Sequence, residues 1–245
     1  MLRDYQIEMK TRLMEAWKAH RSVMVQMPTG TGKTHLLASV VSEFVSSAGS
    51  GVWLIAHRRE LVAQMEETLA KYGIRREDTP VRVMSVQWLS RHWNEAGDAP
   101  GLIVIDEAHH ALAASYTEMW KRYPAAKKLG VTATPCRLNR RGFTELFEVL
   151  VTSWSIAEFI EKGVLSVFDY VSIRPGSEEQ RLIDGLEKRG ADGDYQVKEM
   201  DAVLNRRPGI ERLYRSVRQF ASGKKGMVYA ISIEHARRIA AVSYT

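Results

Sequence analysis

A glycine-rich stretch ends in a lysine and a threonine, two residue types that suit phosphate and magnesium binding. Residues 27–34 read Met-Pro-Thr-Gly-Thr-Gly-Lys-Thr and follow a short apolar segment at residues 23–26. Glycines let several backbone N–H groups converge on one phosphate, and a helix that starts there adds partial positive charge. We expect Lys33 to reach the β- and γ-phosphates of ATP and the Thr34 hydroxyl to coordinate Mg²⁺. The residues predicted to bind ATP in this stretch are Thr29, Gly30, Thr31, Gly32, Lys33 and Thr34.

Two adjacent carboxylates, Asp106 and Glu107, follow a continuous apolar segment at residues 102–105. Such a segment predicts a strand buried on both faces, and parallel sheets bind ligands at the carboxyl ends of their strands. We expect Asp106 to hold Mg²⁺ through water, opposite Thr34, and Glu107 to polarise the water that attacks the γ-phosphate. Ordinary acidic residues at a solvated strand end are the alternative, which the phosphate loop upstream disfavours.

The elements that must position these residues have the pattern of a parallel α/β sheet. Short apolar segments alternate with longer helical ones through the first half of the chain. The predicted strands are residues 23–26, 52–56, 81–84, 102–105 and 129–132, and the predicted helices are residues 34–45, 59–72 and a segment that contains Tyr116 and Trp120.

The pattern changes beyond about residue 139. Ser155 and Glu158 predict a capping box that opens a short helix, and Gly163 ends it. Further helices are predicted from Ser177 and around Pro208. The remaining predictions are strands at residues 167–173 and 227–231 and a last helix at residues 233–242.

Two motifs together resemble the ATPase core of the superfamily 2 DEAD/DEAH-box helicases. They are Lys33-Thr34 and Asp106-Glu107-Ala-His109. Other segments resemble further motifs of that family, in the family's order. They are residues 2–6 (adenine recognition), 53–64 (motif Ia), 85–87 (motif Ib), 130–135 (motif III) and 226–232 (motif IV). The amino-acid sequences of these segments are most similar to those of the group that includes restriction-enzyme motor subunits and repair helicases of the XPB type.

The resemblance implies roles for individual residues. Gln6 is expected to bond the adenine edge, with Arg3 nearby. The residues expected to couple the ATP state to nucleic-acid grip are His109, Thr132 and Thr134, and those expected to contact nucleic acid are Arg58, Gln64, Ser85 and Gln87.

The resemblance also predicts the domain organisation. Residues 1–150 are expected to form a RecA-like parallel sheet flanked by helices, the fold of P-loop NTPases. Residues 151–222 are expected to be a mostly helical connector, and residues 223–245 the start of a truncated second RecA-like lobe. Motifs V and VI are absent, so the second lobe is expected in cis from a longer chain.

The charge balance permits a nucleic-acid partner. The chain has 245 residues, with 35 Lys and Arg against 29 Asp and Glu and a net charge of +6. Arg58 starts the helix after a strand, at the sheet edge where ATP is expected, so it could hold phosphates without reading bases. For Arg58 the alternative is an exposed cation at a helix start. For Trp88 and Trp93, base stacking is possible, but packing in the core is favoured.

The function predicted from these features is that of an ATP-dependent helicase or translocase, with DNA favoured over RNA. Two alternatives stay open: a P-loop enzyme that modifies a small molecule, and a module that binds ATP and nucleic acid without productive turnover. No apolar segment is long enough to span a membrane, and the single cysteine, Cys136, cannot form an internal disulfide. A cytoplasmic location is therefore expected.

Overall fold

The computed structural model describes residues 2–57, 59–108, 114–135, 144–172, 177–189 and 195–243. The chain divides into two compact units, Met1–Val167 and Phe168–Thr245. In the described residues no helix is long and apolar enough to cross a membrane.

The first unit is built on a six-stranded sheet in the order β3-β2-β4-β5-β1-β6, and every neighbouring pair of strands is parallel. The predicted RecA-like parallel sheet is therefore confirmed. The strands are β1 (Ser22–Gln26), β2 (Val52–Ala56), β3 (Val81–Ser85), β4 (Leu102–Asp106), β5 (Lys127–Thr132) and β6 (Val149–Thr152).

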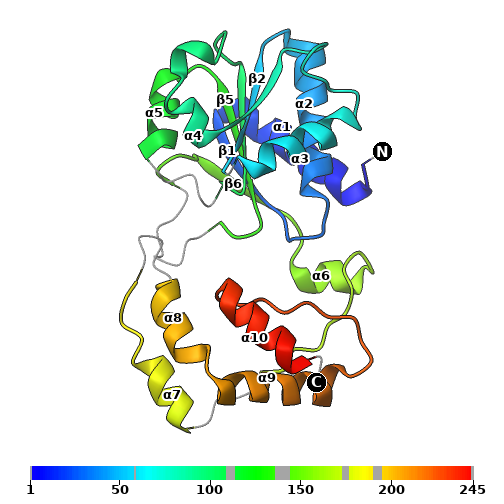
Figure 1. Cartoon of the computed structure of the whole chain (residues 1–245). Helices are drawn as coiled ribbons and strands as arrows, with labels where there is room; N and C mark the ends of the chain where they lie inside the picture. Colours follow the sequence, from blue (N-terminus) through cyan, green and yellow to red (C-terminus); the bar gives the residue numbers. More distant parts are fainter. Residues whose placement is uncertain are drawn as a thin grey trace. The chain divides into compact units, whose positions relative to one another are not determined.

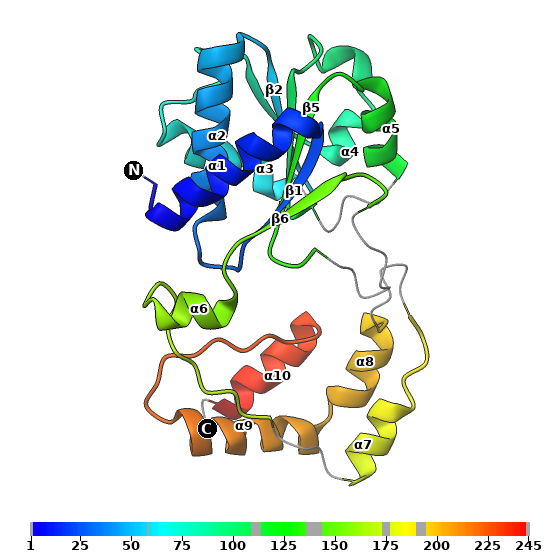
Figure 2. The ribbon, with the colours of Figure 1, turned by 180° about the vertical axis from the view of Figure 1, so that it is seen from behind.

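Helices cover both faces of this sheet (Figure 1, Figure 2). α1, α2 and α3 pack on the face that carries Val23 and Leu102, whereas α4 and α5 pack on the face that carries Met24 and Ile103. Neighbouring residues of one strand thus enter different cores, as the alternation of side chains along a strand requires. The helices are α1 (Asp4–Ala19), α2 (Lys33–Ala48), α3 (Glu60–Ala70), α4 (Val86–Leu89) and α5 (Ala114–Arg122), with a short 3₁₀ turn at Trp93–Glu95.

The first unit ends with α6 (Ile156–Glu161), which starts with the predicted capping box. The Ser155 hydroxyl accepts the backbone N–H of Glu158, and the Glu158 carboxylate accepts the backbone N–H of Ser155. These bonds from the backbone and hydroxyl of Ser155 lower the pKa of Glu158. Phe159 is fully buried and meets Tyr5 of α1 edge-on, with 5.1 Å between ring centroids. The helix is thereby packed against α1.

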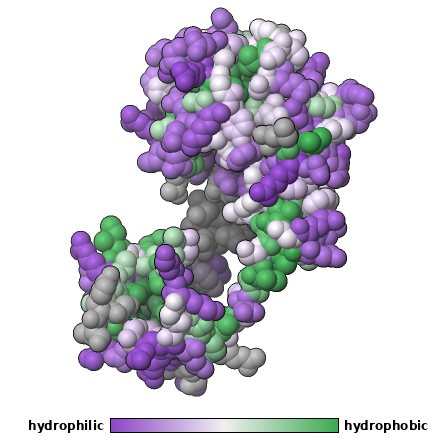
Figure 3. Space-filling view, turned by 90° about the vertical axis from the view of Figure 1, so that its right-hand side faces the viewer, coloured by the Kyte–Doolittle hydropathy of each residue, from purple (hydrophilic) through white to green (hydrophobic). Residues whose placement is uncertain are grey.

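The second unit contains α7 (Ser177–Asp184), α8 (Val197–Leu204), α9 (Arg207–Ala221) and α10 (Ile233–Ser243). Two predictions are wrong here: of the described residues, neither 167–172 nor 227–231 forms a strand. Both segments have strand-like composition, but a strand needs a neighbour for its backbone hydrogen bonds. Most of their large apolar side chains are instead exposed, including Tyr170 at 84% and Tyr229 at 89%. Hydrophobic residues are accordingly visible on the surface of this unit (Figure 3).

The division into lobes at residues 150 and 222 stays a prediction. The structure adds that residues 151–167, assigned above to the connector, belong to the first compact unit. They complete β6 and form α6.

Candidate functional site

The glycine-rich loop joins β1 to α2 with the backbone geometry of a phosphate loop. Gly30 and Gly32 have φ angles of +84° and +77°, in the left-handed region that favours glycine. Gly32 is also the N-cap of α2, so the loop leads directly into the helix N-terminus. A Cβ at Gly32 would collide with the side-chain amide of Gln6. Both glycines are therefore required by the shape of the loop.

Residues of α1 hold this loop from one side. The Gln6 amide donates to the carbonyl oxygens of Thr31 and Gly32, each at 3.1 Å. The Tyr5 hydroxyl donates to the same Thr31 oxygen at 2.9 Å. The Gln6 side-chain oxygen accepts the Arg3 backbone N–H at 2.8 Å. The segment predicted to recognise adenine thus lies beside the phosphate loop, and the adenine contacts themselves stay a prediction.

Lys33 and Thr34 form the first turn of α2. The Lys33 ammonium lies 3.5 Å from the carbonyl oxygen of Met27, across the loop from its own backbone. Thr34 is exposed, as is Thr29 on the loop. The structure therefore leaves the Thr29 and Thr34 side chains, at the loop and at the helix start, exposed to solvent.

The carboxylate pair stands at the same edge of the sheet. Asp106 is the last residue of β4 and lies level with Val131 of β5, whose next residue, Thr132, is level with Gln26 at the end of β1. The strand ends that carry Asp106, Thr132 and the phosphate loop are therefore neighbours.

The backbone at Glu107 is strained. Its φ angle is +51°, and no other non-glycine residue in the described part of the chain has a positive φ. This conformation costs about 1–3 kcal/mol and is found where a site requires it. The backbone N–H of Glu107 donates to the Asp106 carboxylate at 3.0 Å, which orients the Asp106 side chain against the Glu107 backbone.

The predicted coupling residues Thr132 and Thr134 form a closed turn at the end of β5. The Thr132 hydroxyl donates to the Thr134 carbonyl oxygen at 3.0 Å and accepts the Thr134 N–H at 3.1 Å. The Thr132 carbonyl oxygen accepts the N–H of Met27 at 3.0 Å. This turn is thus bonded to the first residue of the phosphate loop. His109, the third predicted coupling residue, lies outside the described residues.

The predicted nucleic-acid contacts fall into three groups. Arg58 lies outside the described residues. Gln64 is exposed on α3. Ser85 is buried, and its hydroxyl caps α4 by accepting the Trp88 N–H at 3.2 Å, while the exposed Gln87 donates to the His57 carbonyl oxygen at 2.7 Å. Gln87 therefore joins α4 to the residue after β2, whereas Ser85 caps α4 locally, and direct contact with nucleic acid stays a prediction.

A protein-family comparison decides the family of this chain. Residues 1–137, more than half of the chain, match the family described as "Type III restriction enzyme, res subunit". The chain belongs to this family. The predicted resemblance to superfamily 2 helicases is confirmed by this match and by the relatives below.

Two curated relatives of this member of the res-subunit family are named as a helicase and as a translocase. The putative ATP-dependent helicase IRC3 of Saccharomyces cerevisiae is 26% identical over 98% of this chain and 38% of its own length. The DNA 3'-5' translocase XPB2 of Sulfurisphaera tokodaii is 28% identical over 77% of this chain and 44% of its own length. This chain therefore spans less than half the length of either relative.

A solved structure supports the fold. The UvsW helicase from bacteriophage T4 aligns with a TM-score of 0.52 at 17% identity, over 61% of this chain and 59% of that one. At this identity the likeness concerns the fold alone.

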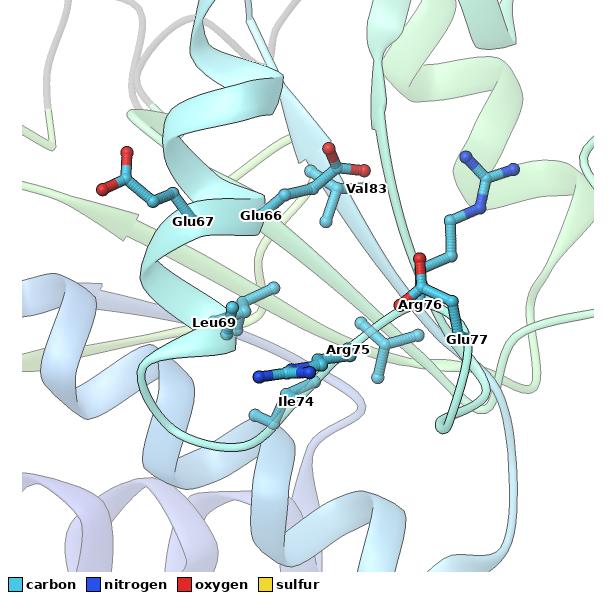
Figure 4. A pocket seen from close by; sticks show the side chains of 10 residues that line it. Glu66, Glu67, Leu69, Ile74, Arg75, Arg76, Glu77 and Val83 are labelled. Atoms are coloured by element: carbon cyan, nitrogen blue, oxygen red, sulfur yellow. The ribbon is translucent and has the colours of Figure 1, made fainter.

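The edge strand β3 contributes lining residues to two surface pockets. The smaller, about 410 Å³, lies beside the start of the strand and is lined by Glu66 and Glu67 of α3 and by Arg75, Arg76 and Glu77. Glu66 points to the side of Arg76, whereas Glu67 points away from it (Figure 4). This pocket lies at the amino ends of the strands, opposite to the phosphate loop. The larger, about 990 Å³, runs between α3 and α4 and reaches Ser85 and Gln87.

Sequence reasoning missed two features of the site. The Tyr5 hydroxyl bond to Thr31 joins residues far apart in the chain, and only the tyrosine directly before Gln6 could have suggested it. The sequence favours packing in the core for Trp88, but this residue is 39% exposed and lines the larger pocket.

Proposed function

We propose that this chain is the ATP-binding lobe of a nucleic-acid-dependent helicase or translocase that acts on DNA. The observation that carries the proposal is the meeting of two features at one sheet edge. A phosphate loop with left-handed Gly30 and Gly32 opens α2, and Asp106 and Glu107 end β4 beside it. Phosphoryl transfer depends mainly on positioning and charge, and these residue types supply both.

In the proposed mechanism the loop amides and Lys33 bind the β- and γ-phosphates of ATP. The hydroxyl of Thr34 and the carboxylate of Asp106 fit Mg²⁺, which prefers oxygen ligands. When bound, Mg²⁺ would neutralise developing charge on the phosphates. Glu107 orients and deprotonates the attacking water, and its strained backbone keeps the carboxylate at the end of β4.

Coupling to nucleic acid is proposed to pass through the Thr132–Thr134 turn. Its hydroxyl and backbone bonds join the end of β5 to Met27. A change in the phosphate loop would thus shift this turn, and with it the surface that grips the track. The name of the Sulfurisphaera relative supports DNA as that track. The greater length of the relatives supports a second RecA-like lobe that completes the ATP site in the full-length protein.

Measuring ATP turnover tests the proposal. The chain is assayed alone and with single-stranded DNA, duplex DNA and RNA, with Glu107→Gln as the blank. Stimulation by DNA, lost in Glu107→Gln, is the expected result. Stimulation by RNA alone would overturn the choice of DNA. ATP binding without turnover under any condition would favour the second candidate, a module that binds ATP and nucleic acid without hydrolysis.

Salt dependence gives a further check on the nucleic-acid partner. Contacts to phosphates release counterions, so the affinity for DNA should fall steeply between about 50 and 200 mM salt. An affinity for DNA that does not change with salt would contradict binding through phosphate contacts such as the one expected for Arg58.

A further inference from the structure

One aromatic residue of the first unit stands apart from the rest. Trp88 is 39% exposed, and in the part of the chain that the structure describes, which includes all six tryptophans, the other five are less exposed. An indole that stays partly exposed forgoes part of the stabilisation that apolar burial gives, so its position calls for an explanation.

The local structure forces Trp88 outward. α4 is a single turn whose buried residues are Val86 and Leu89, and these anchor it to the sheet. The Ser85 hydroxyl accepts a hydrogen bond from the backbone N–H of Trp88, which fixes the start of the turn. Trp88 therefore projects from the side of α4 that does not pack on the core.

The orientation of the Trp88 indole is also fixed, by the neighbouring His92 ring. The His92 ring stacks on the indole with 4.9 Å between centroids and 11° between planes. The His92 Nδ1 lies 2.8 Å from the Trp88 carbonyl oxygen, which ties the imidazole to the same turn. Because His92 stacks on one face of the indole, a base could stack only on the other face. The pair forms a rigid aromatic platform.

The platform lines the larger pocket, a groove of about 990 Å³ between α3 and α4. Arg59, at the start of α3, and Arg91, one turn after Trp88, line the same groove and are exposed. The other charged residues that line it are Arg76, Arg82, Glu60, Glu66 and Glu95, so arginines outnumber carboxylates by four to three. The groove continues to Gln87 at the carboxyl edge of the sheet. Aromatic rings beside arginines are the combination that binds single-stranded nucleic acid, by stacking on bases and pairing with phosphates.

We propose that Trp88, backed by His92, is a stacking platform for a base of single-stranded nucleic acid, with Arg59 and Arg91 meeting the flanking phosphates. This inference rests on the proposed function and adds a contact with a base to a grip otherwise expected on phosphates alone. Any base has a flat face, so the contact confers no sequence preference.

The test compares two single-stranded DNA probes of equal length and charge, an oligo-thymidine and an oligomer of abasic sites. Binding is measured on the full chain for wild type, Trp88→Ala and Trp88→Phe. Wild type should bind the oligo-thymidine about five- to 150-fold more tightly than the abasic probe, since stacking is worth about 1–3 kcal/mol per base. Trp88→Ala should lose this difference, and Trp88→Phe should keep most of it.

Controls separate stacking from charge and from misfolding. Arg91→Gln should weaken the binding of both probes equally. It should also reduce the slope of log affinity against log salt concentration by about one. Because Trp88 is outside both core clusters, Trp88→Ala should keep the wild-type circular dichroism spectrum and Tm. Oligo-thymidine should quench more of the tryptophan fluorescence of wild type than of Trp88→Ala.

The outcomes are distinct. If wild type binds oligo-thymidine and Trp88→Ala binds it as tightly, the platform is refuted and the proposed function stands. If wild type binds no nucleic acid, the nucleic-acid part of the proposed function fails together with the platform. Quenching by poly-glutamate and not by the oligonucleotide would assign the groove to an acidic protein segment and overturn the inference.

Discussion

The hydroxyl of Tyr5 donates a 2.9 Å hydrogen bond to the carbonyl oxygen of Thr31, which joins the first turn of α1 to the phosphate loop. The Tyr5 ring is fixed from the other side, with Trp154 at 5.5 Å and Phe159 at 5.1 Å between centroids. The loop geometry thus depends on residues that follow the sheet as well as on the loop itself.

Replacing Tyr5 by Phe should remove this bond and keep the ring cluster. Loss of one buried hydrogen bond costs about 0.5–1.5 kcal/mol, so affinity for ATP should fall about two- to tenfold. A titration with a fluorescent ATP analogue measures the change. Tyr170→Phe is the matched control, because Tyr170 is 84% exposed. Equal affinity in the Tyr5 and Tyr170 variants would show that the bond does not shape the loop.

Gly32→Ala and Gly73→Ala separate backbone strain from steric collision. The two glycines have φ angles of +77° and +74°, so alanine should cost each about 1–2 kcal/mol of stability. A Cβ at Gly73 meets nothing within 4 Å, whereas a Cβ at Gly32 meets the Gln6 amide. Only Gly32→Ala should therefore displace the phosphate loop and weaken ATP binding, by about tenfold or more. Similar ATP affinities for the two variants, measured by calorimetry, would contradict this account of the loop.

The strained backbone of Glu107 predicts a difference in stability between two inactive variants. Both Glu107→Gly and Glu107→Ala should abolish hydrolysis. Glycine accepts the φ angle of +51° without strain, so Glu107→Gly should be more stable than Glu107→Ala by about 1 kcal/mol. Urea denaturation of both variants gives the comparison. A more stable alanine variant would mean that position 107 is not held in the left-handed region.

The capping box of α6 predicts a pH-dependent contribution to stability. The pKa of Glu158 is lowered by its bonds from the backbone and hydroxyl of Ser155. A carboxyl with a lowered folded pKa stabilises the fold above its unfolded pKa, and this stabilisation disappears as the pH falls through the folded pKa. The difference in unfolding free energy between wild type and Glu158→Gln should therefore shrink in acid. A difference that stays constant from neutral pH into acid would exclude this role.

The sequence predicts the first unit well because local pattern and tertiary context agree there. β2 has the predicted bounds, Val52–Ala56, since a short apolar run between breaks has few alternatives in a parallel sheet. The ATP-site residues follow from strand ends that share one edge. β6 was missed because only one of its four residues, Val151, is buried, which leaves a weak apolar signal on an edge strand.

Other features depend on contacts that no local pattern carries. The exposure of Trp88 follows from α4 being one turn long, with Val86 and Leu89 facing the core. Residues 167–172 and 227–231 have the composition of strands but no neighbouring strand in the described part of the chain. The bond from the Gln6 amide to Gly32 spans residues far apart in sequence, so spacing alone could not reveal it.

Magnesium-dependent ATP binding tests the central claim most directly. Calorimetric titration with ATP is carried out on wild type and Lys33→Ala, each with Mg²⁺ and with a chelator. The account predicts that wild type binds ATP more tightly with Mg²⁺ and that Lys33→Ala binds it at least about tenfold more weakly, because a charge-assisted contact to the phosphates is lost. Equal affinity in wild type and Lys33→Ala, with no effect of Mg²⁺, would contradict the assignment of the loop and of the carboxylate pair as an ATP site.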